Sequence, residues 1–279
     1  MFDLARIAAS GLVAEIDFHE SLGSTSDRAL ALGAQGEVEL PLLVLATRQT
    51  AGRGRGSNRW WSADGALTFS LVLKAPPDRL PAQRWPQVAL VAGIAVCEAL
   101  EAFALRADLA VKWPNDVYLS GSKICGILSE SVPGWRDRLV VGIGINVNNR
   151  GQESGVRSQE PGARSDCGGP LATHPALPFS AASLIEQDGV PRDLTEVLLS
   201  VLDEFDRRWQ ELLDGQFEAA ANVYRERCFL TGKTVTIEQP GGQRVVGVCR
   251  GIDDSGGLRV QTERGEETVV SGAVVGWDD

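Results

Sequence analysis

The stretch PLLVLATRQTAGRGRGSNRWWSADGALTFSLVLK, Pro41 to Lys74, contains the pattern that decides the fold. It begins with an apolar run, PLLVLATRQ, that predicts a buried strand ending at Gln49. It ends with ALTFSLVLK, in which large apolar residues alternate with smaller or polar ones, as they do in a half-buried strand. Between the two runs lies TAGRGRGSNRWWS, Thr50 to Ser62. The stretch therefore predicts a sheet with an arginine-glycine loop joining two of its strands.

The arginine-glycine loop is locally basic in an acidic protein. It contains three arginines, which are Arg53, Arg55 and Arg59. No Asp or Glu occurs in residues 41–63, whereas the whole chain of 279 residues has a formal net charge of -10. Glycines let the backbone approach a ligand closely, and a planar guanidinium donates two parallel hydrogen bonds to a carboxylate or a phosphate. The loop therefore predicts an anion site that Trp60 and Trp61 could enclose; a solvated turn and an RGG-like nucleic-acid segment are the alternatives.

Apolar periodicity extends an α/β pattern on both sides of this stretch. Ser24-Thr25-Ser26-Asp27 offers the hydroxyl and carboxylate groups that cap the start of a helix. Further along the chain, the spacing of the apolar residues predicts helices and strands. They are a helix at Trp85–Phe103, a strand at Leu109–Trp113, a hairpin at 117–127, a strand at Leu139–Asn148, and helices at Leu194–Leu213 and Phe217–Cys228.

Two later regions depart from this pattern. Residues 149–179 are rich in Gly, Pro and Ser and have no periodicity, which is typical of a long mobile lid or of a dispensable loop. From Thr231 to Trp277, the short strands TVTIE, RVVGVCRGI, GLRVQT and EETVV alternate with turn signals and predict a small antiparallel barrel. We therefore expect two domains, at residues 1–228 and 229–279.

A second group of polar residues lies in VKWPNDVYLSGSKICGILSE, Val111 to Glu130. Lys112 and Lys123 are ammonium donors that suit phosphate, and Asn115 or Asp116 could hold a magnesium ion through oxygen. The alternative for each residue is an ordinary charge on the face of a hairpin, and Glu130 is better explained by a structural role. Asn146, in GIGIN at the end of a predicted strand, adds one amide side chain.

Several kinds of catalytic site are disfavoured. The sequence contains no GxxxxGK[ST], no HExxH, no GxSxG, and no GxGxxG that precedes a helix. His19 and His174 are the only histidines, and neither has neighbours that suggest a catalytic partner. A histidine-dependent hydrolase or a zinc enzyme is therefore a poor explanation of this chain.

Composition indicates a soluble protein of a reducing compartment. The five cysteines show no CxxC spacing, which suits free thiols. The N-terminus has no apolar run of the signal-peptide type, and Glu98 interrupts the longest apolar stretch, Val88 to Leu100. We therefore expect a cytoplasmic protein without a membrane segment. The acidic balance also disfavours nucleic acid as a partner, because such binding needs a broad basic surface.

The motifs, taken in order, resemble those of the bacterial biotin protein ligase family. They are GSTS at 23–26, QTAGRGRGSNRWWS at 49–62, VKWPNDVYLSGSKICGILSE at 111–130, VVGIGINVN at 140–148, and the terminal β-domain. The resemblance runs from about Ser21 to the C-terminus. It implies a catalytic domain built on a mixed sheet and an SH3-like C-terminal barrel. It also implies formation of biotinyl-5′-adenylate from biotin and ATP with magnesium, followed by transfer of biotin to one lysine of a carboxyl-carrier domain.

The resemblance also implies roles for the residues at the biotin end of the site. Ser24, Thr25, Ser26 and Gln49 would bind the ureido ring of biotin, with Gly126 beside it. Two departures from the family pattern fall here. The family usually has Asn where this chain has Ser26, and it often reads Gly-Arg-Gly-Arg-x-Gly, whereas Gly56 and Ser57 follow Arg55 in this chain.

At the nucleotide end, the resemblance implies a loop that closes over biotin and adenylate and a lysine that bridges the two reacting anions. Arg53, Gly54 and Arg55 would form the loop, with Arg55 on the carboxylate and phosphate, and Lys123 would be the bridging lysine. Residues expected at ATP and its magnesium ion are Lys112, Asn115, Asn146 and, as the metal ligand, Asp116. The loop at 149–179 would order over adenine, with Phe179 as the candidate ring that clamps it.

The expected partner is the biotin carboxyl carrier domain of acetyl-CoA carboxylase or of a related carboxylase. Only about twenty residues precede GSTS, so we expect no helix-turn-helix domain and no operator binding, and a monomer or a weak homodimer. A lipoate or octanoate ligase or transferase of the same fold is the nearest alternative, and a nucleic-acid-binding protein is the alternative from another class.

Overall fold

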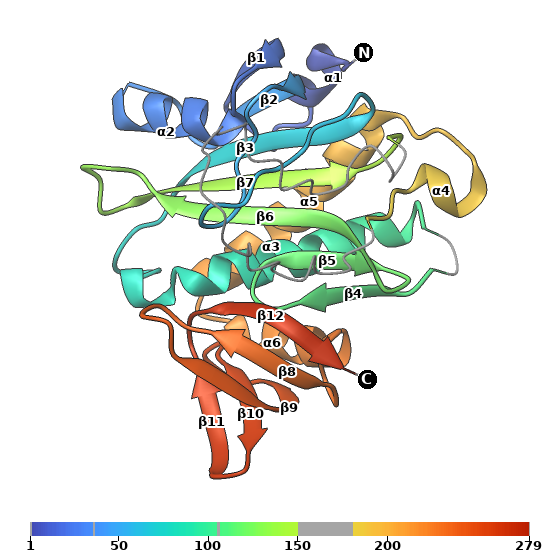
Figure 1. Cartoon of the computed structure of the whole chain (residues 1–279). Coiled ribbons are helices and arrows are strands. Elements are labelled where there is room, and N and C mark those ends of the chain that lie inside the picture. The colour runs from blue at the N-terminus through green and yellow to red at the C-terminus, as the bar shows by residue number, and fades with distance from the viewer. Residues whose placement is uncertain (1, 36, 105–106, 150–180, 279) are drawn as a thin grey trace, which may run out of the picture.

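The fold is built on one seven-stranded mixed sheet, seen in a computed structural model that describes residues 2–35, 37–104, 107–149 and 181–278 (Figure 1). Its strands run in the order β1-β2-β3-β7-β6-β5-β4, and only β1 and β2 are parallel neighbours. The bounds are β1 Glu15–Leu22, β2 Leu42–Gln49, β3 Ala66–Lys74, β4 Leu109–Lys112, β5 Asp116–Leu119, β6 Ser122–Ser131 and β7 Arg138–Asn146.

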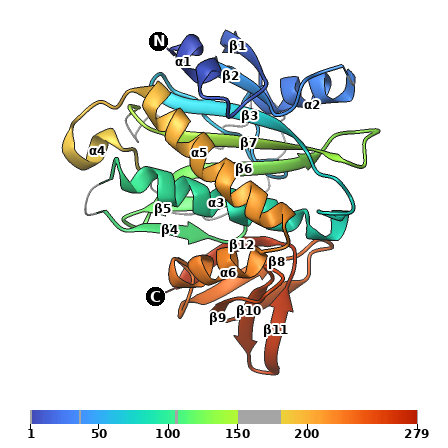
Figure 2. The ribbon, with the colours of Figure 1, turned by 180° about the vertical axis from the view of Figure 1, so that it is seen from behind.

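The helices cover the two faces of this sheet unequally. They are α1 Leu4–Ala9, α2 Thr25–Gln35, the short 3₁₀ helix η1 Ala82–Arg84, α3 Pro86–Glu101, α4 Ile185–Asp188, α5 Leu194–Leu213 and α6 Phe217–Glu226. Helices α3 and α5 pack against each other across one face (Figure 2), whereas α2 contacts β2, β3 and β7. The large apolar residues of β3, Leu67 to Leu73 at alternate positions, join the core of α3 and α5, whereas Val72 joins the smaller core under α2. The alternation expected from the sequence is confirmed, but the expectation of a half-buried strand is wrong, because α2 and the buried Thr68 and Ser70 cover the second face of β3 as well.

The start of α2 follows the predicted capping pattern. The hydroxyl of Ser24 accepts a hydrogen bond from the backbone amide of Asp27 at 3.3 Å, which satisfies one of the free amides of the first turn. Ser24, Thr25 and Ser26 are all buried. The capping residues are therefore turned toward the sheet, and this places their hydroxyl groups over one of its faces.

The C-terminal domain is a five-stranded antiparallel sheet in the order β11-β10-β9-β8-β12. Its strands are β8 Thr234–Glu238, β9 Arg244–Ile252, β10 Leu258–Thr262, β11 Gly265–Val269 and β12 Ala273–Asp278. Strands β11 and β12 do not pair within residues 181–278, so the predicted barrel is present as a curled SH3-like sheet without a fully hydrogen-bonded closure. The domain lies against α6, β4 and α3 (Figure 1).

Some boundaries differ from the sequence-based expectations for identifiable reasons. The helix predicted to reach Cys228 ends at Glu226, because Cys228 forms a bridge to Val111 and the amide of Phe229 donates to the Val111 carbonyl at 2.9 Å. Helices α1 and α4 are short, and β12 contains Gly276, so none of the three had a clear apolar period. The four cysteines in the described ranges are free thiols. The predicted lid at 149–179, with His174 and Phe179, lies outside the described residues except for Asn149.

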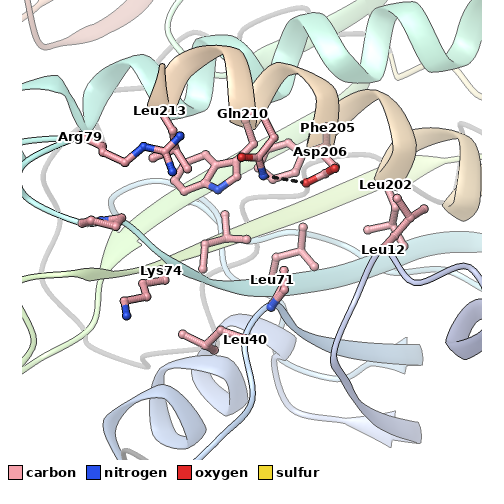
Figure 3. A pocket seen from close by; sticks show the side chains of 14 residues that line it. Leu12, Leu40, Leu71, Lys74, Arg79, Leu202, Phe205, Asp206, Gln210 and Leu213 are labelled. Atoms are coloured by element: carbon pink, nitrogen blue, oxygen red, sulfur yellow. Dashed lines mark hydrogen bonds between the residues drawn. The ribbon is translucent and has the colours of Figure 1, made fainter. Parts of the chain in front are cut away.

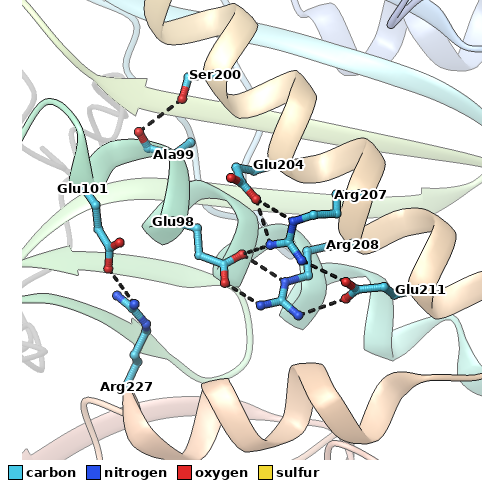
Figure 4. A network of polar contacts seen from close by, with 9 residues as sticks. All are labelled: Glu98, Ala99, Glu101, Ser200, Glu204, Arg207, Arg208, Glu211 and Arg227. Atoms are coloured by element: carbon cyan, nitrogen blue, oxygen red, sulfur yellow. Dashed lines mark hydrogen bonds and ion pairs between the residues drawn. The ribbon is translucent and has the colours of Figure 1, made fainter.

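Helices α3 and α5 are also joined by an ion-pair network (Figure 4). Glu98 of α3 accepts from Arg208 Nε at 2.9 Å and from Arg207 Nη2 at 2.7 Å, and Arg208 also donates to Glu211 at 2.9 Å. Arg208 is only 6% exposed. Burial alone would raise the pKa of Glu98, but the hydrogen bonds and charges of Arg208 and Arg207 outweigh burial and hold that pKa below its ordinary value.

Replacing Glu98 with glutamine is expected to lower the free energy of unfolding by about 2 kcal/mol at neutral pH, because the buried Arg208 loses the carboxylate of α3 and keeps that of Glu211. A carboxylate with a lowered folded pKa stabilises the fold above its unfolded pKa and loses that contribution as the pH falls through the folded value. The difference between the two proteins should therefore shrink below about pH 4. Denaturant unfolding across pH measures it. Glu204→Gln is the matched control, since Glu204 pairs only with the more exposed Arg207, and equal losses for both variants would contradict the assignment.

The helix-covered side of the sheet also carries an apolar hollow of about 260 Å³ between β3 and α5 (Figure 3). Leu71, Phe205 and Trp209 line it, and Gln210 donates to Asp206 at 3.1 Å beside it. Separately, none of the helices in the described ranges combines the length and the apolar character that a membrane crossing requires.

Candidate active site

The sheet face opposite α3 and α5 has a floor made of glycines. Gly126 of β6 and Gly144 of β7 lie directly opposite each other in the register of these strands. The Trp60 ring rests on both: a Cβ added at Gly144 would lie 2.3 Å from Trp60 Cε2, and one added at Gly126 would lie 3.3 Å from Trp60 Cζ3. Only glycine allows a ring to approach the strand backbone this closely. The face therefore forms a flat apolar floor with an aromatic cover.

Hydroxyl and amide groups gather at one end of this floor. Gln49 Oε1 accepts from the Thr25 amide at 2.7 Å and from Thr25 Oγ1 at 3.1 Å. Ser70 Oγ donates to Thr25 Oγ1 at 2.9 Å and lies 3.2 Å from Ser26 Oγ. The structure thus brings Thr25, Ser26 and Gln49 together, with Ser24 at the adjacent cap. Ser26 packs over Gly142, where an added Cβ would lie 2.5 Å from its hydroxyl.

The arginine-glycine loop folds as a miniature hairpin. Arg53 and Arg59 form an isolated antiparallel bridge, and the Gly54 amide donates to the Asn58 carbonyl at 2.8 Å. Gly56 has a φ of 66° at the reversal of the chain, a conformation that side chains with a Cβ rarely adopt. The Gly56-Ser57 departure from the family pattern therefore coincides with the turn of this hairpin. Of the two tryptophans expected to enclose a pocket, Trp60 lies inward and Trp61 is 61% exposed.

Arg53 is compensated by carboxylates from elsewhere in the chain. Its guanidinium donates to both oxygens of Glu130 at 2.9 and 2.6 Å, and its Nε lies 2.6 Å from Asp27 Oδ1. The local absence of acidic residues in the sequence is thus offset in the fold by β6 and α2. In this structure Arg53 anchors the base of the loop, and Glu130 has the structural role expected of it.

Two ammonium groups converge on one carboxylate beside the glycine floor. Lys123 Nζ lies 2.6 Å from Asp116 Oδ1, and Lys112 Nζ lies 3.8 Å from Asp116 Oδ2. Burial lowers the pKa of Lys112 to about 8; the negative charge of Asp116 opposes that effect, and the positive charge of Lys123 adds to it. Among the residues that the structure describes, these two cations share one anion, and a cluster of this kind favours further anions.

The remaining predicted residues lie at the edge of this cluster. Asn115 Nδ2 donates to the Ile127 carbonyl at 2.6 Å and ties the β4–β5 turn to β6. Asn146 Oδ1 accepts from Asn149 Nδ2 at 2.9 Å at the end of β7. Arg55 donates to the Gly272 carbonyl of the C-terminal domain. Arg55 and Asn115 also border a hollow of about 380 Å³ between the two domains.

The protein offers few ligands of its own for a metal ion. No group of three or more His, Cys, Asp or Glu side chains suited to a metal occurs among the residues that the structure describes. Asp116 supplies one carboxylate. Magnesium commonly takes one or two carboxylates and completes its shell with phosphate oxygens and water, so this donor set fits a magnesium ion that arrives with a polyphosphate.

The contacts of several residues that complete the site could not be predicted from the sequence. Asp27 and Glu130 compensate Arg53, Ser70 links the hydroxyls above the sheet, and Gly272 receives Arg55. Each is distant in sequence from its partner, and no local pattern marks it. The pairing of β3 with β7 and of β6 with β7 would have been a useful signal, since it places Ser70 beside Gly142 and Gly126 beside Gly144.

Comparisons with known proteins agree with this fold and site. The sequence pattern of the Biotin/lipoate A/B protein ligase family matches residues 19–148, and that of the Biotin protein ligase C terminal domain matches residues 230–275. The first pattern defines the class of protein, and the second is that of a domain of biotin protein ligases.

Individual relatives support the same assignment. The chain is 31% identical to a biotin–[acetyl-CoA-carboxylase] ligase of Mycobacterium tuberculosis, over 93% of this chain and 87% of that protein. It is 34% identical to a biotin–[acetyl-CoA-carboxylase] ligase of Paracoccus denitrificans, over 83% and 88% of the two chains. A biotin protein ligase from Aquifex aeolicus, solved with biotin and ATP, matches with a TM-score of 0.72 and 28% identity, over 92% of this chain and 96% of that one. The chain belongs to the biotin protein ligase family.

Proposed function

We propose that this protein is a biotin–[acetyl-CoA-carboxylase] ligase that forms biotinyl-5′-AMP and transfers biotin to a lysine of a biotin carboxyl carrier domain. The proposal rests on one observation, which is that an apolar site and an anion-binding site lie next to each other. A glycine floor covered by Trp60 suits an apolar ring, and the Lys112–Asp116–Lys123 cluster beside it suits anions. Biotin has both features, because its fused ring system ends in a carboxylate.

The first half-reaction follows from this arrangement. The biotin ring would lie against the Trp60 ring, which rests on Gly126 and Gly144, with its ureido group toward Thr25 and Gln49. Its carboxylate would then reach Lys123, which would exchange its bond to Asp116 for the substrate. The carboxylate oxygen attacks the α-phosphate of ATP, and pyrophosphate leaves. Lys123 offsets the repulsion between the two anions as they approach and the charge that develops on the phosphorus oxygens.

Lys112, Asn115 and Asn146 are proposed for the nucleotide end of the site. The excess positive charge of the lysine cluster would bind the triphosphate, with Asp116 released from one or both lysines. Magnesium, when bound, would neutralise phosphate charge, and Asp116 is the carboxylate available to it in the described residues.

In the second half-reaction the amine of the carrier lysine attacks the mixed anhydride carbonyl, an amide bond forms, and AMP leaves. The intermediate must be kept from water and from other amines until the carrier arrives. The loop of Arg53, Gly54 and Arg55 lies beside Trp60 and is proposed to provide this cover. Its base is anchored by the pairing of Arg53 with Glu130, so Arg55 and the loop tip are the parts free to change contacts.

The function is tested by incubating the purified chain with ATP, magnesium and an apo carrier domain, together with labelled biotin, lipoate or octanoate. We expect the label to enter the carrier lysine with biotin alone, with release of one pyrophosphate for each biotin. Incorporation of lipoate or octanoate in place of biotin would assign the protein to the other branch of the same family. A carrier whose target lysine is replaced by arginine is the control for labelling at the correct residue.

Replacing Gly144 with alanine is expected to raise the KM for biotin by about tenfold or more, since the new Cβ would overlap the Trp60 ring and overpacking costs roughly 1–3 kcal/mol. The overlap follows from the 2.3 Å separation that this Cβ would have from the ring. Steady-state pyrophosphate release at varied biotin measures it. Gly93→Ala on the opposite face is the control, because its Cβ would make only ordinary contacts, the nearest at 3.6 Å. A biotin KM that is the same in both variants would remove Trp60 and the glycine floor from the biotin site.

A further inference from the structure

One cation of the proposed nucleotide site is held by an aromatic side chain of the C-terminal domain. Lys112 is 5% exposed, and its Nζ lies 4.9 Å from the centre of the Trp277 ring. Tyr118 of the catalytic domain is a second aromatic neighbour, at 5.8 Å. An ammonium within about 6 Å of a ring centre is attracted to the ring face, and tryptophan gives the strongest attraction of the aromatic residues. The Trp277 ring therefore attracts the Lys112 ammonium, as the carboxylate of Asp116 does.

The Trp277 ring is itself fixed in place from both domains. Its centre lies 5.7 Å from that of Phe229 at an interplanar angle of 90°, and 6.2 Å from that of Tyr118 at 77°. Phe229 and Tyr118 stack with their centres 4.6 Å apart. Edge-to-face and offset-stacked contacts of this kind stabilise a defined ring orientation. Trp277 is also paired with Val235 in the β8–β12 register, so the whole C-terminal sheet supports its position.

Other contacts of the C-terminal domain reach the same part of the site. Trp113 Nε1, next to Lys112 in sequence, donates to the Gly256 carbonyl at 3.2 Å. Arg55 donates to the Gly272 carbonyl in the turn before β12. The β4–β5 turn and the arginine-glycine loop are thus both in contact with this domain. The nucleotide end of the site is completed by residues that lie far beyond the catalytic motifs.

We propose that Trp277 is a positioning residue for ATP: it holds the Lys112 ammonium in the direction of the triphosphate, so that the C-terminal domain contributes directly to nucleotide affinity. The proposal rests on the proposed function. A lysine side chain loses considerable rotamer freedom when it is fixed, and a preorganised ammonium binds phosphate more tightly because that cost is met before ATP arrives. Trp277 touches neither substrate in this account, and it acts through Lys112.

The test compares Trp277→Phe and Trp277→Leu with the wild type in assays of pyrophosphate release at varied ATP and at varied biotin. Leucine keeps an apolar group but removes the ring, and phenylalanine keeps a ring with a weaker attraction for cations. We expect the KM for ATP to rise by about tenfold for Trp277→Leu and by about threefold for Trp277→Phe. The KM for biotin should stay within about twofold, because the glycine floor and Trp60 are unchanged.

Val274→Ala is the matched control for damage to the C-terminal domain. Val274 lies in the same strand, is 7% exposed and belongs to the apolar core. It should lower the stability of the protein without changing the KM for ATP. A tenfold rise in that KM for Val274→Ala as well, or equal values for Trp277→Leu and the wild type, would overturn the role of Trp277. Absence of biotin-dependent pyrophosphate release from the wild type would instead overturn the proposed function, so the two failures are distinguishable.

Discussion

Replacing Lys123 with alanine is expected to slow biotin-dependent pyrophosphate release by about a hundredfold to a thousandfold, which is the usual effect of removing one charge-stabilising donor from a transition state. Lys123 Nζ lies 2.6 Å from Asp116 Oδ1 and 3.5 Å from where a Cβ of Gly126 would be, so it stands where the glycine floor meets the charged cluster. That is where a carboxylate on the floor would meet a phosphate. Without Lys123, the two anions would approach each other with Asp116 still beside them, and the barrier would rise.

The loss should fall mainly on the rate of adenylate formation, which a single-turnover measurement of pyrophosphate release reports. Transfer from added biotinyl-5′-AMP to the carrier should be affected less, because that step no longer brings two anions together. Lys74→Ala is the control, since Lys74 is an exposed lysine at the end of β3 on the rim of the hollow in Figure 3. Unchanged pyrophosphate release from Lys123→Ala would exclude Lys123 from the chemical step.

Replacing Arg55 with alanine is expected to let the adenylate escape from the site. The biotin label found on lysines of bystander proteins should then rise about tenfold above the wild-type level. Arg55 donates to the Gly272 carbonyl, and the loop that carries it lies next to Trp60 over the floor. A guanidinium that moves from this carbonyl to the carboxyl-phosphate group would make charge-assisted hydrogen bonds to the intermediate. Losing those bonds should shorten its residence in the site. Labelled biotin with an added bystander protein measures the escape directly.

Arg59→Ala provides the comparison within the same loop. Arg59 has the same charge and is exposed, and it pairs with Arg53 only through the backbone bridge. It should keep labelling confined to the carrier. Retention of the intermediate by Arg55→Ala, or equal escape from both variants, would show that Arg55 does not hold the adenylate.

Much of the catalytic domain could be predicted because its elements have strong local patterns. The alternation from Leu67 to Leu73 marks β3, since only one face of that strand meets α3 and α5. The apolar stripe of Leu194–Leu213 predicts both ends of α5 correctly. The Gly-rich and Lys-containing motifs could be placed on a loop and a hairpin, and the structure puts them side by side through the contacts of Arg53 with Glu130 and of Trp60 with Gly126. Strand β12 was missed because Gly276 interrupts its short apolar run.

The sequence by itself determined most of the strands, the main helices, the two-domain order and the residue types of an anion site, because each depends on neighbours a few positions away. The tertiary structure decided what those residues touch. It paired Arg53 with Glu130 and Asp27, set Trp60 on the glycines of two strands, and placed Trp277 against Lys112. These contacts depend on strand order, register and domain packing, which bring together residues as distant in sequence as Lys112 and Trp277 and leave no local pattern in the sequence.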